Sequence, residues 1–265
     1  LRPQVGQGVV AENMRRLLEG SDIVEAYKKD RVQDAYSLRC LPQVHGASRD
    51  AVGYVKEKIE IEINSVTDNP IIFHKDGEAI SGGNFHGQPL AMAMDFFGIA
   101  AAEFASISER RVARLVDHKL SDLPPFLVSD SGVNSGFMIP QYTAAAIVSE
   151  NKVLAHPSVV DSIPTSANQE DHVSMGGYSA RKARQILNNT NRVIAIEMVN
   201  AAQGMDFRAP LKPGKGSGAA FKEFRKHVPF YEKDQFMQPL LLKSLELVED
   251  GTVVKAVEEA VGELN

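Results

Sequence analysis

Apolar residues recur at helical spacing along most of this sequence. Between about residues 88 and 118 they return every three or four positions, at Leu90, Met94, Phe97, Ala101, Phe104, Ile107 and Leu115. A helix over that range would be about 45 Å long at 1.5 Å per residue. A second apolar line on the same helix, Met92, Phe96 and Ile99, predicts that it packs on more than one side.

Other segments also have helical patterns. Helices are predicted over about residues 137 to 155 and 177 to 203, and shorter ones in the tail end with residues 253 to 264. Ser48 is expected to cap a helix whose apolar positions are Val52, Val55, Ile59 and Ile63. The Asp68-Asn69-Pro70 turn would close that helix. A short helix over residues 31 to 40 would be ended by Pro42.

Strand-forming residues are confined to one short region. Ile71-Ile72-Phe73 and Ala79-Ile80 flank an Asp76-Gly77 turn, which predicts a small β-hairpin. The glycine-rich stretch from Lys212 to Gly218 is predicted to be a loop, because no strand precedes it and the Walker spacing is absent. The pattern predicts an all-α protein, a long-helix bundle with one small hairpin. The sequence shows no internal repeat and no clear domain boundary.

Composition excludes several classes of function. A chain of 265 residues that is 43% hydrophobic can bury a sizeable core in one large domain. The formal net charge of -5 argues against binding to nucleic acid or to an anionic membrane. No uninterrupted apolar run approaches the ~20 residues of a membrane-spanning helix. The single cysteine, Cys40, excludes an internal disulfide and fits a reducing cytoplasm.

Two segments concentrate polar side chains. The first, residues 166 to 177, contains Asn168-Gln169-Glu170-Asp171-His172, a density that a simple connecting loop rarely needs. The alternative is a solvated loop whose Asn and Asp cap the next helix. In the second, Gln33, Tyr36 and Arg39 recur at every third position of the predicted short helix. Arg suits a carboxylate, Tyr can transfer a proton and Gln can orient either, although a plain polar helix face would look similar.

Metal and hydrolase chemistry are poorly supported. No two of the seven histidines form an i, i+4 pair with a glutamate between them: His45, His74, His86, His118, His156, His172 and His227. No metal site is therefore expected. No Gly-x-Ser-x-Gly elbow follows a predicted strand.

The two polar segments, together with four further stretches, resemble the histidine ammonia-lyase branch of the aromatic amino-acid ammonia-lyases. The four stretches are Glu62 to Pro70, Ser81 to Gly87, Asn134 to Tyr142, and Ser179-Ala180-Arg181-Lys182. The resemblance runs from about residue 3 to the C-terminus. A fumarase-type lyase is a rival of similar helical content, but the lysine expected after Pro140 is replaced by Gln141 and Tyr142.

The resemblance implies a carbon-nitrogen lyase that eliminates ammonia from L-histidine to give urocanate. Such enzymes use 4-methylidene-imidazol-5-one, which forms from an Ala-Ser-Gly tripeptide. This sequence contains no Ala-Ser-Gly. Residues 1–265 are therefore expected to be the C-terminal helical part of an ammonia-lyase, inactive alone, with the electrophile on a missing N-terminal half.

Substrate contacts follow from the resemblance residue by residue. It implies that Arg39 holds the substrate carboxylate, with Gln33 and Asn69 in the same polar shell. Tyr36 would lie close to the electrophile and position or transfer protons. A bidentate guanidinium suits the first role in charge and geometry.

The remaining assignments concern the substrate ring. Phe85 would pack beside the prosthetic group, unless it is an ordinary core aromatic. Glu170 would face the substrate side chain or transfer a proton, with His172 supporting that loop. A carboxylate opposite an imidazole makes physical sense, because the ring can donate to it. Phenylalanine or tyrosine ammonia-lyase or aminomutase activity is the close alternative.

A different class of function also fits the long helices. The chain could be a non-catalytic helical scaffold subunit, since two apolar faces on one helix suit a bundle shared between subunits. The resemblance itself implies homotetramers whose active sites draw on several chains.

Overall fold

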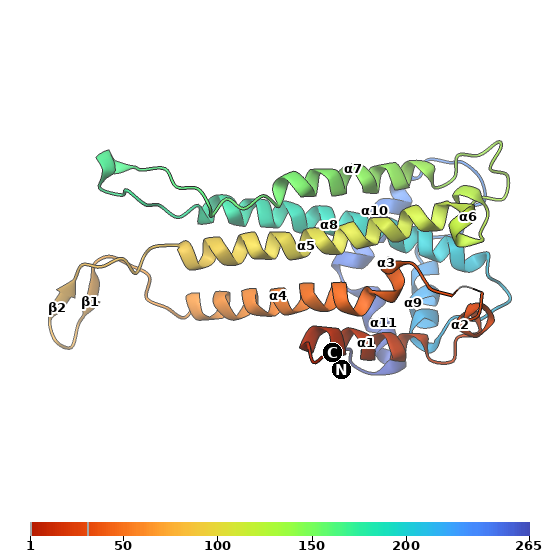
Figure 1. Ribbon diagram of the computed structural model, residues 1–265, viewed down its shortest axis with the longest axis horizontal. Coiled ribbons are helices and arrows are strands. Elements are labelled where there is room, and N and C mark those ends of the chain that lie inside the picture. The colour runs from red at the N-terminus through yellow and green to blue at the C-terminus, as the bar shows by residue number, and fades with distance from the viewer. Residues whose placement is uncertain (1, 31) are drawn as a thin grey trace.

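Four long helices form an elongated bundle. The computed structural model describes residues 2–30 and 32–265. The helices α4 (Leu41–Glu62), α5 (Gln88–Val116), α7 (Met138–Leu154) and α8 (Gly176–Asp206) run side by side along the long axis (Figure 1). With 29 residues, α5 is about 44 Å long at 1.5 Å per residue. The predicted all-α bundle is confirmed, and the boundaries of the three longest predicted helices lie within a few residues of those observed.

Small residues bring α5 and α8 together along most of their length. The buried face of α5 includes Ala91, Gly98, Ala101 and Ala105. A Cβ atom on Gly98 would lie 3.1 Å from Cδ1 of Ile186 on α8, so a larger residue would push the helices apart. Small side chains at this contact therefore keep the two axes close, and the site elements are attached to these two helices.

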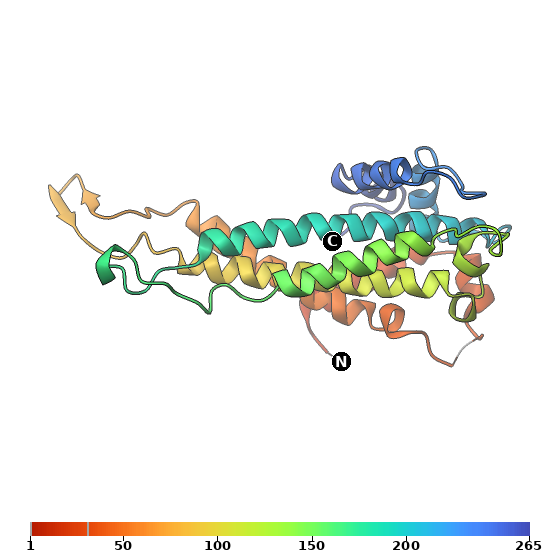
Figure 2. The same ribbon diagram turned by 90° about the horizontal axis from the view of Figure 1, so that it is seen from above.

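Shorter helices cover one end of the bundle. They are α1 (Val5–Leu18), α2 (Asp22–Tyr27), α3 (Tyr36–Arg39), α6 (His118–Ser121), η1 (Pro125–Leu127), α9 (Lys215–Arg225), α10 (Gln238–Glu249) and α11 (Thr252–Val261). Figure 2 shows the C-terminal helices, in blue, on one side of the long helices. The main apolar core lies here, where Val199 of α8 meets Phe224, Val228 and Leu247.

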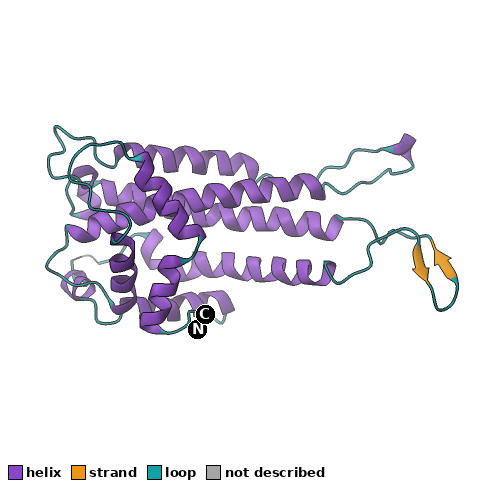
Figure 3. Cartoon of the chain, turned by 180° about the vertical axis from the view of Figure 1, so that it is seen from behind, coloured by secondary structure: helices purple, strands orange, loops and turns teal. Residues whose placement is uncertain are grey.

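Two segments extend beyond the other end of the bundle, as Figure 3 shows from behind. One is the predicted hairpin, in which β1 (Ile71–Phe73) pairs antiparallel with β2 (Glu78–Ile80). The other is residues 157 to 175, with the short turn η2 (Ser166–Asn168) at its tip. Both segments carry residues that the sequence assigned to a site.

The start of α4 differs from the prediction. Only Tyr36–Arg39 is helical in the predicted segment 31 to 40, whose first residue lies outside the described residues. Pro42 does not end a helix but lies in the first turn of α4. Proline is tolerated there because its missing N–H would have no intrahelical partner. Ser48 is buried inside α4 and caps nothing.

The predicted loop from Lys212 to Gly218 is also partly wrong, because α9 already begins at Lys215. Gly216 lies within this helix where it meets α1. A Cβ atom on Gly216 would lie 2.7 Å from Cδ2 of Leu17. This glycine therefore allows close helix packing rather than a flexible connection.

By length and hydropathy, α5 is the one helix among the described residues that could cross a membrane, although its apolar residues are interrupted by Asp95 and Glu103. It lies against α4, α7 and α8, and its Asp95 is buried in polar contacts. These contacts are those of the central helix of a bundle.

Candidate active site

The Gln33, Tyr36 and Arg39 side chains lie together at α3, although Gln33 precedes the helix and does not share its face. Backbone bonds from Leu38 and Arg39 N–H groups to the Ala35 carbonyl, 3.0 and 2.9 Å long, form this single turn. Arg39 Nη1 donates to the side-chain oxygen of Gln33, and the Arg39 Cζ lies 4.4 Å from the centre of the Tyr36 ring. No carboxylate among the described residues pairs with this guanidinium. Its charge is therefore available to an external anion.

Asn69 and Phe85 lie at the opposite end, beside the hairpin. The Asn69 side-chain oxygen accepts 3.0 Å hydrogen bonds from the Ser81 hydroxyl and the Gly82 N–H. The Phe85 ring is 54% exposed, so Phe85 is not a core residue of this chain. Both side chains therefore present surface beyond the end of the bundle.

Glu170 lies in the second projecting segment, where it pairs with Thr165 as an isolated β-bridge. Its carboxylate accepts hydrogen bonds from the Thr165 hydroxyl and, at 3.1 Å, from the Ser166 hydroxyl. These bonds, Thr165 first, lower the pKa of Glu170 below its ordinary value. An exposed, ionised carboxylate results.

Two histidines connect the projecting segments. The rings of His86 and His172 stack with centroids 5.9 Å apart and an interplanar angle of 7°. His86 Nε2 also lies 2.9 Å from the His172 carbonyl oxygen. Since His86 follows Phe85 directly and His172 is close to Glu170, this contact joins the Phe85 segment to the Glu170 segment.

Asp95 holds both ends of the Glu170 segment, a role that the sequence analysis missed. One carboxylate oxygen accepts hydrogen bonds from the Val159 N–H at 2.7 Å and the Ser179 hydroxyl at 3.0 Å. The other lies 3.4 Å from Lys182 Nζ, which also donates to the His156 carbonyl. The sequence does contain a signal for this role. Asp95 interrupts an apolar helix face, and a carboxylate buried at such a position needs polar partners on neighbouring elements.

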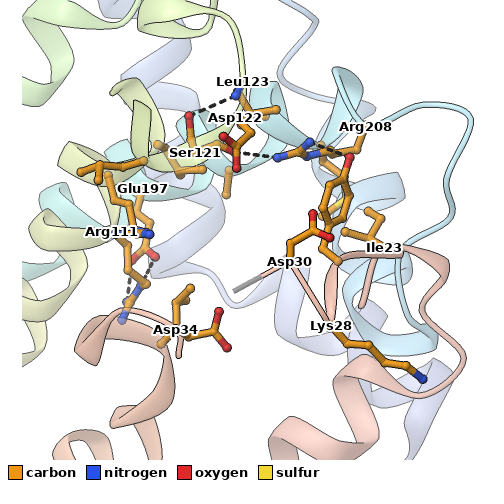
Figure 4. Close-up of a pocket in the computed structure, with 18 residues that line it drawn as sticks. Ile23, Lys28, Asp30, Asp34, Arg111, Ser121, Asp122, Leu123, Glu197 and Arg208 are labelled. Carbon is orange, nitrogen blue, oxygen red and sulfur yellow. Dashed lines mark hydrogen bonds and ion pairs between the residues drawn. The ribbon is translucent and has the colours of Figure 1, made fainter. Parts of the chain in front are cut away.

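A cavity of about 480 Å³ lies between the N-terminal segment around Ile23 and Asp34 and the helices that carry Arg111 and Glu197 (Figure 4). It is bounded by Leu38 of α3, by Arg111 and Arg114 of α5, and by Glu197 of α8. The Arg111 and Glu197 side chains form an ion pair in its wall. The sequence did not single out these charges. Among the described residues, no group of three or more His, Cys, Asp or Glu side chains could hold a metal ion.

The candidate residues therefore form two separate groups. The exposed Tyr36 and Arg39 side chains belong to α3, which lies against α5, and Gln33 joins them there; the segments with Asn69, Phe85 and Glu170 extend beyond the other end of the bundle (Figure 1). The resemblance implies that Asn69 and Arg39 share one polar site. A single copy of the chain does not bring these two side chains together.

Comparison with known proteins identifies similar sequences and structures. The profile of the family described as aromatic amino acid lyase matches residues 1–226. The chain is 56% identical over 261 residues to a histidine ammonia-lyase of Alkaliphilus oremlandii, with 98% of this chain and 52% of that protein covered. The crystal structure of histidine ammonia-lyase from Trypanosoma cruzi is 45% identical, with a TM-score of 0.90, over 99% of this chain and 49% of that one.

A tyrosine aminomutase from Streptomyces globisporus is also similar, at 36% identity and a TM-score of 0.91, over 100% of this chain and 54% of that one. The chain spans about half the length of the curated relatives it matches. With most of its residues matched by the family profile and its fold shared with these enzymes, the chain belongs to the aromatic amino acid lyase family.

Proposed function

We propose that this chain is part of an enzyme that eliminates ammonia from L-histidine to give urocanate. The observation that carries the proposal is the Arg39 guanidinium. It donates to Gln33, lies over the Tyr36 ring and has no carboxylate partner among residues 2–30 and 32–265. An amino-acid substrate supplies the missing carboxylate. Sequence identity of 56% to a protein named histidine ammonia-lyase supports histidine as the amino acid.

Each polar group has a task in this proposal. Arg39 binds the substrate carboxylate with two parallel N–H···O bonds. The Tyr36 hydroxyl lies on the same turn and can position or transfer a proton beside the bound amino acid. Glu170, ionised and exposed, accepts a hydrogen bond from the imidazole N–H of the substrate.

The proposal requires more than one copy of the chain. The two groups of candidate residues are attached to different ends of the bundle, so one copy would supply α3 and another the hairpin and Glu170 segments. Exposed apolar side chains on α5 offer a surface for such pairing, since Met92, Phe96 and Ile99 are 55%, 44% and 45% exposed. We propose the homotetramer that the family resemblance implies.

The prosthetic group would come from outside these 265 residues, since they contain no Ala-Ser-Gly tripeptide. The exposed ring of Phe85 could pack against a flat heterocycle, so the residues present fit 4-methylidene-imidazol-5-one. When bound, this group supplies the electrophilic carbon that ordinary side chains lack. Phe85 would exclude water from one of its faces.

The test is urocanate absorbance with purified protein and L-histidine. The chain alone should show no turnover above background, and adding the N-terminal half of an ammonia-lyase should restore it. L-Phenylalanine and L-tyrosine are measured in parallel, because similarity to a tyrosine aminomutase keeps these substrates as the alternative. Turnover of tyrosine without turnover of histidine would overturn the proposed substrate, and no turnover of any of the three would favour a scaffold.

A further inference from the structure

A partly buried ion-pair network lies beneath α3. Arg111 of α5 donates from Nε and Nη2 to the two carboxylate oxygens of Glu197 on α8, the second bond being 2.8 Å long. The Ser108 hydroxyl adds a 2.5 Å bond to the same carboxylate. The Arg111 and Glu197 side chains are 15% and 19% exposed. Their charges satisfy each other, so Arg111 is not offered to an external anion as Arg39 is.

His45 extends the network to α4. Its Nε2 lies 3.3 Å from Arg111 Nη1. Because guanidinium only donates, the neutral His45 ring accepts this bond. Burial, followed by the Arg111 charge, lowers the pKa of His45 to about 4, so the ring is neutral at physiological pH. Its centroid lies 5.2 Å from that of Phe104 on α5, which fixes the ring further.

Backbone hydrogen bonds connect His45 to the candidate substrate residues. The Cys40 N–H donates to the Tyr36 carbonyl at 3.0 Å, and the Val44 N–H donates to the Cys40 carbonyl at 3.0 Å. Residues 36 to 45 therefore form one continuous corner, defined here as the α3–α4 corner. Leu38, within it, lines the same cavity as Arg111 and Glu197. The corner thus contacts the network at His45 and borders the same cavity at Leu38.

We propose that Arg111, Glu197 and His45 are positioning residues that hold the α3–α4 corner against α5 and α8, so that Tyr36 and Arg39 face the substrate in one fixed orientation. The substrate part of this inference rests on the proposed function, whereas the holding of the corner does not. Holding Arg39 in place spares the substrate the cost of ordering this corner when it binds.

Arg114 provides a matched control. It also projects from α5 and lines the cavity. In contrast to Arg111, it forms no hydrogen bond or ion pair with any described residue. Replacing either residue by alanine removes the same charge from the same cavity wall. Only Arg111→Ala should release the corner.

The first experiment uses the 265-residue chain and needs no activity. Amide hydrogen exchange is measured at Leu38, Arg39 and Cys40, whose N–H groups close the corner, together with the alkylation rate of Cys40. Arg111→Ala should raise these rates about tenfold, which corresponds to about 1.4 kcal/mol of lost local protection, and Arg114→Ala should leave them within about twofold. Equal rates in the two variants would overturn the proposal.

A second pair of variants covers the case in which Arg111→Ala does not fold. His45→Gln supplies an amide oxygen that can accept from Arg111, and His45→Leu supplies none. Corner protection should survive His45→Gln and be lost in His45→Leu. If His45→Leu protects the corner as well as native His45, the network does not hold it.

The last experiment uses the complete enzyme and a double-mutant cycle. Arg111→Ala should reduce kcat/KM for histidine about tenfold, mainly through a higher KM, because Arg39 no longer meets the carboxylate. In an Arg39→Ala background, Arg111→Ala should cost almost nothing further. Additive losses would overturn the positioning role. If the unsubstituted enzyme releases no ammonia from histidine, the proposed function fails. The exchange rates still test whether the network holds the α3–α4 corner.

Discussion

Arg39 and Glu170 differ in how far their charges are already satisfied. The Arg39 guanidinium has a neutral amide and an aromatic face as partners, whereas the Glu170 carboxylate accepts bonds from two hydroxyls. A carboxylate substrate therefore adds a charged partner to Arg39. At Glu170 an imidazole must replace or share the Thr165 and Ser166 hydroxyls. In the proposed function, substrate binding and substrate specificity therefore depend on different residues.

Arg39→Ala should weaken catalysis in the complete enzyme by roughly 2 to 5 kcal/mol in kcat/KM, because the substrate carboxylate loses its anchor in an ion pair that the proposed assembly buries. Arg39→Lys should recover only part of this loss, since a point charge cannot reproduce the planar fork. The measurement is steady-state urocanate formation. Arg208→Ala is the control, because Arg208 lies at the same 4.4 Å over Tyr27 and carries no proposed substrate contact. If Lys serves as well as Arg, the bidentate role is wrong.

Glu170→Gln preserves the side-chain volume and removes the charge, so kcat/KM for histidine should fall by roughly 100-fold or more. The melting temperature should stay unchanged, because Glu170 is exposed and outside the core. Kinetics on histidine, phenylalanine and tyrosine are compared with those of Asp171→Asn, its exposed neighbour. Unchanged histidine turnover in Glu170→Gln would leave this residue as part of a loop only.

At the scale of elements, polar contacts between helices fix the relative rotation of the helices, which apolar packing alone leaves adjustable. Asp95 ties the Glu170 segment to α5 and α8, and the Arg111 network ties α4 to the same two helices. Apolar packing alone tolerates small rotations, whereas hydrogen-bonded charges need defined geometry. The two tie points lie near opposite ends of α5.

The tie between α4 and α5 should make stability depend on pH. In the folded chain the pKa of His45 is lowered to about 4 from an ordinary value of 6.5. The unfolded state therefore binds more protons between these values, and stability that is complete above pH 6.5 is lost as the pH falls toward 4. The free energy of unfolding falls by up to about 3 kcal/mol, and solvent screening of the partly exposed ring reduces this loss.

Thermal melting of the chain from pH 7.5 down to 4.5 measures this loss. His45→Gln should flatten the decline, whereas His74→Gln, at an exposed position of the hairpin turn, should reproduce the native curve. Identical pH profiles for native protein and His45→Gln would contradict the assignment of the titration to His45.

The whole molecule presents apolar surface that one copy cannot cover. Besides Met92, Phe96 and Ile99 on α5, the exposed large side chains include Tyr178 and Leu187 of α8. Both helices belong to the central bundle, so these exposed side chains lie on packed helices rather than on projecting loops. Exposed apolar side chains on rigid helices are typical of helices that pack between subunits.

The chain should therefore form an oligomer in solution, measured by light scattering over a range of concentrations. Met92→Lys with Phe96→Lys should shift it toward smaller species, because each lysine would carry a charge into the contact. Val160→Lys is the control, at a 74% exposed position of the Glu170 segment. A native chain that remains a stable monomer would contradict the proposed assembly.

Sequence reasoning located the long helices because their apolar period is sustained over many turns. It misplaced the start of α4, since Pro42 suits the first turn of a helix as well as the residue after one. It also missed Gly216, whose role depends on Leu17 of a distant helix. Side-chain chemistry and the family resemblance nominated the candidate residues of the site, and their roles stay predictions. Their separation into two groups could not be predicted, because it depends on the direction in which each segment leaves the bundle.

The unbroken course of α5 has a consequence for how this protein can vary. Asp95 and Arg111 lie on one continuous helix, and each must meet a partner on α8. Inserting a single residue between them would shift one end by about 1.5 Å and rotate it by about 100° relative to the other. One of the two ion pairs would then point away from α8. The length of α5 between these residues is therefore fixed to the residue, whereas the hairpin and the Glu170 segment can gain or lose residues without disturbing that angular register.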